Sequence, residues 1–216
     1  MKKISIILIL FLSYCGSEKL LKPTKKEQVT LGITAMTFYL NPSKVKLNFI
    51  LTYINRYGIN NKQVWPMMGF LYGAAKKYGN KYITSRLNYS KKNQIAVRLF
   101  IDSIKYRERT LQKINNRAEL NDLYWGIFFA TGAEEIIVKL LNIANRSVEN
   151  SDYGKFASIM TARWSLCSNA RRYEAIKEVL SEYVNKKEYN RIVIKILTKR
   201  PYYFVKIIRK RQALEH

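Results

Sequence analysis

Hydrophobic residues recur with the spacing of an α-helix along most of this chain. Between residues 49 and 57 they occupy positions i, i+1, i+4, i+5 and i+8, which places them on one side of a helix. Similar stripes run through residues 97–104, 136–144, 176–184 and 192–197. No segment shows sustained alternation of apolar and polar residues, which is the pattern of a half-buried strand. The sequence therefore predicts an all-α protein of about nine or ten helices joined by short turns.

Residues with special backbone or capping properties mark where these helices are expected to begin and end. Asn41 and Pro42 interrupt the pattern, and Ser43 has the side chain of an N-cap. Glycine readily closes a helix because it tolerates a left-handed backbone conformation. The expected interruptions are single glycines and one proline: Gly58, Gly79, Gly132 and Pro201.

The order of the helices leaves two architectures open. Consecutive helices with short links are typical of helical hairpins stacked as in TPR or HEAT arrays. A strict repeat is absent, because Trp65, Trp125 and Trp164 are separated by 60 and 39 residues. The prediction is therefore either an irregular helical-hairpin array, which is a TPR/HEAT-like solenoid, or a compact multi-helix bundle.

Large side chains on the helical stripes form the predicted hydrophobic core. Truncation of Trp164 to alanine would then cost about 3–5 kcal/mol, the usual range for a buried large aromatic. Cys167 continues the same stripe and is expected to be a small buried hydrophobe. The residues predicted to be buried are Trp125, Phe128, Phe129, Phe156, Met160, Trp164, Val179, Leu180 and Tyr183.

The first residues have the order of a secretory signal. Lys2 and Lys3 are followed by an apolar run over residues 4–12 and by Cys15. This segment resembles the signal of bacterial lipoproteins, with Tyr14 standing where that family usually has a small residue. The resemblance implies cleavage before Cys15, lipid attachment to Cys15, and a membrane-anchored lipoprotein of the bacterial cell envelope. The apolar run is shorter than the ~20 residues of a spanning helix.

These features divide the chain into four expected parts. Residues 1–14 are the lipoprotein signal peptide, and residues 15–27 are the lipidated cysteine and a lysine-rich tether. Residues 28–201 are the helical domain. Residues 202–216 are a basic, amphipathic C-terminal tail.

The charge is strongly positive and unevenly distributed. The chain has 39 Lys and Arg against 15 Asp and Glu, a formal net charge of +24. Acidic residues are absent from residues 28–101 and again from residues 189–214. Such a field attracts polyanions such as lipid headgroups, glycolipid, acidic glycan and nucleic acid. Alternatively, the many lysines reflect a biased composition and only keep the surface solvated. The sequence leaves both interpretations of the charge open.

Two groups of basic residues are candidates for binding an anionic surface. The first group interleaves with tyrosines, which would also suit single-stranded nucleic acid, although an exported protein rarely meets it. The second lies in the tail, where a helix would place Phe204, Ile207, Ile208 and Arg211 on one side. That apolar side could meet the membrane or could cap the last helices. The candidates are Lys76, Lys77, Lys81 and Arg86 in the first group, and Lys206, Arg209, Lys210 and Arg211 in the second.

Residues that could support catalysis are scarce. The single histidine is His216, the last residue, and the only cysteines are Cys15 and Cys167. His-based triads and His-bearing or Cys-only metal sites are therefore excluded. Glu134 and Glu135 are candidate acids for glycan cleavage, but acids in a first helical turn also favour the helix dipole. The prediction is no enzyme activity, no cofactor and no metal.

Three further segments resemble an uncharacterised family of bacterial TPR/HEAT-like helical proteins. They are Asn41, Pro42 and Val45 with residues 69–71; residues 125–132; and residues 162–170. The resemblance implies a helical fold and no particular activity.

The resulting hypothesis is a non-enzymatic, lipid-anchored bacterial envelope protein. Its basic helical scaffold would bind a partner protein or an anionic envelope component, such as anionic lipid or glycolipid. The alternative is a peripheral envelope enzyme that acts on glycan with Glu134 or Glu135 as the acid. The oligomeric state is left open.

Overall fold

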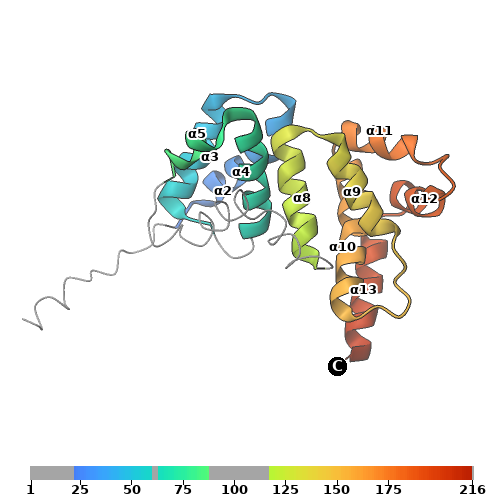
Figure 1. Cartoon of the computed structure of the whole chain (residues 1–216). Coiled ribbons are helices and arrows are strands. Elements are labelled where there is room, and N and C mark those ends of the chain that lie inside the picture. The colour runs from blue at the N-terminus through green and yellow to red at the C-terminus, as the bar shows by residue number, and fades with distance from the viewer. Residues whose placement is uncertain (1–21, 60–62, 88–116, 216) are drawn as a thin grey trace, which may run out of the picture.

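The described part of the chain is all-α, as predicted. The computed structural model describes residues 22–59, 63–87 and 117–215, and no strand occurs among them (Figure 1). None of the helices in these ranges is long and apolar enough to cross a membrane. The elements are α2 (Lys25–Met36), η1 (Phe38–Leu40), α3 (Lys44–Tyr57), α4 (Val64–Tyr78), α5 (Asn80–Thr84), α8 (Ala118–Thr131), α9 (Glu134–Asn145), α10 (Tyr153–Ala170), α11 (Glu174–Glu182), α12 (Asn190–Thr198) and α13 (Pro201–Glu215).

Local sequence signals account for several of the helix ends. The Ser43 side chain accepts a hydrogen bond from the Lys46 backbone N–H at the start of α3, as its N-cap role predicts. Gly58, Gly79 and Gly132 end α3, α4 and α8 with positive φ angles of 76°, 88° and 69°. Pro201 is the first residue of α13. Proline is tolerated there because a backbone N–H at that position has no partner within the helix.

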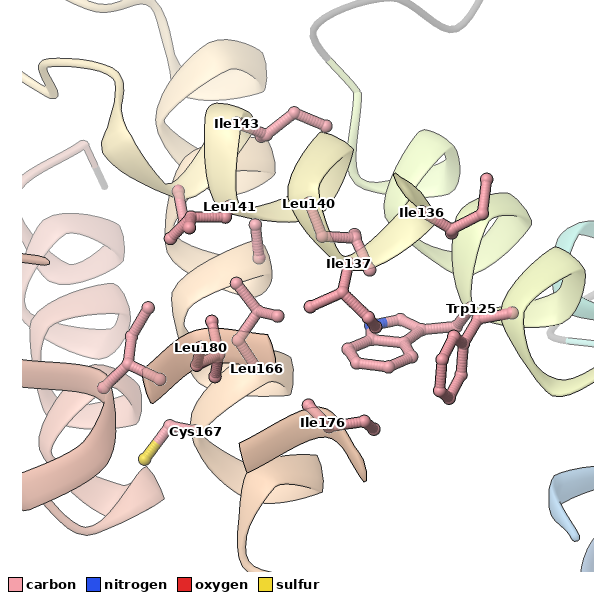
Figure 2. Close-up of a cluster of buried hydrophobic side chains, with 14 of the residues drawn as sticks. Trp125, Ile136, Ile137, Leu140, Leu141, Ile143, Leu166, Cys167, Ile176 and Leu180 are labelled. Carbon is pink, nitrogen blue, oxygen red and sulfur yellow. The ribbon is translucent and has the colours of Figure 1, made fainter. Parts of the chain in front are cut away.

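The buried residues form two hydrophobic clusters. The N-terminal cluster draws mainly on α2, η1, α3 and α4, with Phe38, Ile50 and Leu71 fully buried. The C-terminal cluster draws mainly on α8 to α13. In Figure 2, Trp125 of α8 lies beside Ile137 of α9, and Leu166 of α10 lies close to Leu180 of α11.

Helices α4 and α8 join the two clusters at very short range. A Cβ atom on Gly69 would lie 2.0 Å from the carbonyl oxygen of Leu123, and one on Gly126 would lie 2.0 Å from that of Pro66. One turn after Gly69, Gly73 lies against Ala130. Contact positions therefore advance together along both helices, which shows that α4 and α8 run in the same direction. Glycine is required here because the backbones themselves touch.

Helix α10 is the centre of the C-terminal part. It contacts α8, α9, α11, α12 and α13, whereas a solenoid repeat contacts only its neighbours. The α13 helix runs antiparallel to α10, since Gln212 contacts Tyr153 and Lys199 contacts Cys167 at the other end. This half of the protein is therefore arranged as a bundle around α10.

The predicted core is largely confirmed, with two exceptions, Trp164 and Tyr183. Trp164 is 41% exposed, so its assignment to the core was wrong. The prediction took the apolar stripe of α10 as its one buried side. Instead, α10 is buried on most sides and exposes a single face that contains Tyr153 and Trp164. Tyr183 is only partly buried. The remaining seven are buried: Trp125, Phe128, Phe129, Phe156, Met160, Val179 and Leu180.

Candidate anion-binding surfaces and groove

The first predicted basic group lies at the exposed end of the N-terminal part. Lys76 and Lys77 are in the last turn of α4, Lys81 is in α5, and Arg86 follows α5; all four are exposed. Aromatic rings lie beneath several of these cations. The Arg86 guanidinium is 3.7 Å from the centre of the Tyr82 ring, and the Lys76 ammonium is 5.4 Å from that of Tyr72.

A shallow depression adjoins this group. It has a volume of about 400 Å³ and is lined by Tyr72, Ala75, Lys76, Gly79 and Asn80. The sequence predicted the alternation of tyrosine and basic residues, and the structure shows that the rings lie under the cations rather than beside them as separate stacking platforms. Cation–π contacts of this kind hold the basic heads at the surface.

The second predicted basic group lies on α13. Phe204 is buried, and Ile207 and Ile208 are partly buried against the C-terminal cluster. The Arg211 guanidinium lies 5.7 Å from the centre of the Phe156 ring, on the same side. The apolar side of the tail therefore packs on α10, which is the capping arrangement. Lys206, Arg209, Lys210 and Arg211 are all exposed.

The structure does not bring the two basic groups together. Helix α5 belongs to the N-terminal part, and α13 packs on α10 at the opposite end of the molecule (Figure 1). They are separate surfaces and can be tested separately.

A third basic feature, which the sequence did not predict as a site, is a groove in the C-terminal part. It has a volume of about 440 Å³ and lies between the loop after α9, helix α10 and helix α12. We refer to it as the basic groove. Its lining residues are Asn145, Arg146, Ser147, Val148, Glu149, Arg163, Arg191, Ile192 and Lys195.

The Arg163 side chain is held in place within the basic groove by hydrogen bonds. Its Nε donates a hydrogen bond of 2.7 Å to the carbonyl oxygen of Ala144, and its Nη2 donates one of 3.0 Å to that of Arg146. These carbonyls lie at the C-terminal end of α9, where helical partners are lacking. Burial lowers the pKa of Arg163, nearby Tyr203 opposes this effect, and the positive charge of Arg191 lowers the pKa further.

The sequence contained only partial signals of the basic groove. Arg191 and Lys195 lie in the acid-free stretch of residues 189–214 and are four residues apart, hence on one face of α12. Arg163 is a charged residue on a helix that is otherwise mostly buried. Their convergence depends on how α9, α10 and α12 pack, which periodicity does not reveal.

The candidate glycan-cleaving acids are not arranged as a catalytic pair. Glu134 and Glu135 are both exposed in the first turn of α9. This is the placement that favours the helix dipole rather than a desolvated acid in a cleft. Among the described residues, no group of three or more His, Cys, Asp or Glu is placed to hold a metal ion.

Cys167 is buried, as predicted, but it has polar neighbours. Its Sγ lies 3.1 Å from the carbonyl oxygen of Lys199 and 3.2 Å from Nη1 of Arg171. Burial raises the pKa of the thiol, against the opposing effect of Arg171. Cys15, the leader and most of the tether lie outside the described residues, so lipid attachment stays a prediction.

No protein-family model, curated protein or solved structure matches this chain. The resemblances to lipoprotein signals and to TPR/HEAT-like helical proteins therefore stay predictions.

Proposed function

We propose that this protein is a non-enzymatic, lipid-anchored scaffold of a bacterial envelope that binds an anionic component of its own membrane. The observation that carries the proposal is the orientation of α13. Its apolar side packs against the C-terminal cluster, and its basic side chains remain exposed: Lys206, Arg209, Lys210 and Arg211. A helix fixed in this way offers a row of cations without the need to insert into the bilayer.

The two membrane signals would be complementary. A lipoprotein cysteine carries more than one acyl chain, so the lipid would by itself attach the chain stably to a membrane, and the basic patch need supply only lipid preference and orientation. Each basic residue near an anionic surface contributes about 1 kcal/mol. A lipid on Cys15 would keep the chain at the membrane, and the cations of α13 would select and orient it on anionic headgroups.

Vesicle binding tests this proposal without the lipid. A chain that begins at Gly16 retains every described residue, and we expect it to bind vesicles that contain phosphatidylglycerol but not neutral vesicles. Binding should weaken as the salt concentration rises. Replacement of Lys206, Arg209, Lys210 and Arg211 by glutamine should abolish most of the binding.

The matched control replaces the same number of cations at the other end of the molecule. In this variant Lys76, Lys77, Lys81 and Arg86 become glutamine, and binding should be largely retained. The reverse result would assign the membrane surface to α4 and α5. Equal binding by both variants and the parent chain would contradict the proposal.

The lipid anchor requires its own test. In a bacterial host, Cys15→Ala should move the protein out of the membrane fraction or leave the leader uncut. Mass spectrometry of the parent protein should find Cys15 as a modified N-terminal residue. An unmodified Cys15 behind an intact leader would refute the lipoprotein assignment.

A further inference from the structure

The basic groove contains two cations, Arg191 and Lys195, whose positions the internal contacts of the fold do not explain. Arg163 is explained by its hydrogen bonds to the end of α9. Arg191 and Lys195 are not, because none of the three ion pairs found within the described ranges involves them; those pairs are Arg56–Glu27, Arg117–Glu119 and Lys177–Glu174. The cavity is also lined by the cation Arg146 and by one carboxylate, Glu149. The like charges of Arg163, Arg191 and Lys195 repel one another, and a bound anion would lower that repulsion.

The chemistry of the three cations favours a phosphate group. Arg191 and Lys195 are one turn apart on α12 and lie on the same side as Arg163 of α10. The Arg191 guanidinium can match two phosphate oxygens in a bidentate arrangement, and the Lys195 ammonium adds a compact point charge. Arg163 contributes mainly its positive charge, because its Nε and Nη2 bond backbone carbonyls and its Nη1 lies 3.7 Å from Met160 Sδ. A phosphate monoester carries about −1.5 to −2 charge at pH 7, so it offsets most of this local excess.

The cavity is larger than a phosphate group requires. Its volume of about 440 Å³ falls within the range of sites for small molecules. The side-chain amide of Asn145 donates to the carbonyl oxygen of Glu188, and the hydroxyl oxygen of Ser147 accepts the Glu149 N–H. The amide oxygen of Asn145 and the hydroxyl hydrogen of Ser147 are therefore still available to a ligand. The Glu149 carboxylate, also on the wall, can accept from ligand hydroxyls but repels a phosphate.

We propose that the basic groove binds a phosphorylated polyol, with Arg191 and Lys195 on the phosphate, supported by the positive charge of Arg163, and the Asn145–Glu149 wall on the hydroxyls. The ligand is a soluble sugar or glycerol phosphate, or the same group at the end of a lipid headgroup. The proposal does not rest on membrane binding by α13, because the two sites share no residue.

Isothermal titration calorimetry of the full chain in detergent micelles tests the site. We expect glycerol 3-phosphate or glucose 6-phosphate to bind, and glycerol and glucose not to bind. Arg191→Gln and Lys195→Met should each raise Kd about tenfold, the effect of one lost charge-assisted hydrogen bond. Binding should weaken from pH 7.5 to pH 5, since the second pKa of a phosphate monoester is about 6.

A matched variant controls for net charge. Arg172→Gln combined with Lys187→Met removes two exposed cations outside the groove and should leave Kd unchanged. Thermal unfolding of each variant verifies that the fold is retained. The four α13 substitutions should also leave Kd unchanged, which separates this site from the proposed membrane surface.

Vesicles that contain phosphatidic acid distinguish the two sources of the phosphate. Binding of the soluble compounds assigns a free ligand. Vesicle binding that remains in the α13 variant and is lost when Arg191→Gln is added to that variant assigns a headgroup. Either result supports the site. If no phosphorylated probe binds, or if Arg191→Gln and Lys195→Met bind as tightly as the parent chain, the proposal is overturned.

Discussion

The N-terminal and C-terminal parts both place cations over aromatic rings, but the C-terminal part also uses arginines to link its helices. In the N-terminal part, Glu27 is the one acidic residue between positions 22 and 87, and five of the cations lie over tyrosine rings: Lys44, Arg56, Lys76, Lys77 and Arg86. In the C-terminal part, two arginines donate hydrogen bonds to backbone carbonyls at or near helix ends. Arg163 bonds the end of α9, and Arg171 donates to the carbonyl oxygens of Lys199 and Cys167.

This difference shows that the number of basic residues in a region does not by itself identify an anion-binding surface. Cations over rings keep their charge facing solvent, so they add to the external field of the protein. Arginines that bond backbone carbonyls act as structural links between helices, and their loss leaves polar groups without partners. The four predictions below test this contrast, together with the α4–α8 contact that joins the two parts.

A large effect is expected where the two parts meet. In Gly126→Ala the new Cβ would lie 2.0 Å from the Pro66 carbonyl oxygen and 2.7 Å from the Phe70 nitrogen, so α4 and α8 must separate. The free energy of unfolding should fall by about 3 kcal/mol, the upper part of the range for overpacking. Urea denaturation measures this loss.

Gly32→Ala is the control for that substitution. Gly32 lies within α2, and its added Cβ would have only the end of the Met36 side chain within 4 Å, at 3.9 Å. Alanine is a better helix former, so the free energy of unfolding should rise by about 0.5–1 kcal/mol. A comparable loss in both variants would show that the α4–α8 contact is not special.

The next prediction concerns the stability contributed by the arginines that bond helix ends. Arg163→Met keeps most of the apolar stem but removes the donors to Ala144 and Arg146. We expect a loss of about 2 kcal/mol, because two carbonyl groups at a helix end lose charged donors. Arg86→Met, which removes a cation over a ring, should change stability by less than about 0.5 kcal/mol. Equal losses would erase the contrast between the two parts.

A smaller effect is expected at Trp164. The exposed fraction of 41% means that Trp164→Ala removes a side chain that is only partly packed. The cost should be about 1 kcal/mol rather than the 3–5 kcal/mol of a buried aromatic. Trp125→Ala, in the core, should show that larger cost. Thermal denaturation of both variants provides the comparison.

The smallest effect is a dependence on pH in the N-terminal part. The pKa of Glu27 is lowered from 4.5 to about 2, chiefly by the hydrogen bond from the Tyr57 hydroxyl, then by the bonds from Thr24, with a small contribution from Arg56. The stabilisation from Glu27 is thus complete above pH 4.5 and is lost as the pH falls through 2. Between pH 5.5 and pH 2.5, Glu27→Gln should lose less stability than the parent chain, and Tyr57→Phe should lie between them. A decline of the same size in all three would contradict this role.

Particular residues show what could be predicted from the sequence. The ends of α3, α4 and α8 at Gly58, Gly79 and Gly132 were predictable, because helix closure is a local backbone property. The exposure of Trp164 was not, since it depends on which neighbours cover α10. For the same reason, the basic groove could not be predicted: Arg163 and Arg191 are close only through the packing of α10 and α12.

The glycine contact between α4 and α8 also has a consequence for folding kinetics. The two helices are separated by the 39 residues from 79 to 117, so their contact is long-range in sequence. Closing a loop of that length costs entropy before the contact can form. The two backbones fit together only when Gly69 and Gly126 are both in register. A partly docked arrangement of the two helices therefore gains little packing energy. Docking of α4 on α8 is therefore expected to be a late step in folding, after each part has gained its own helices.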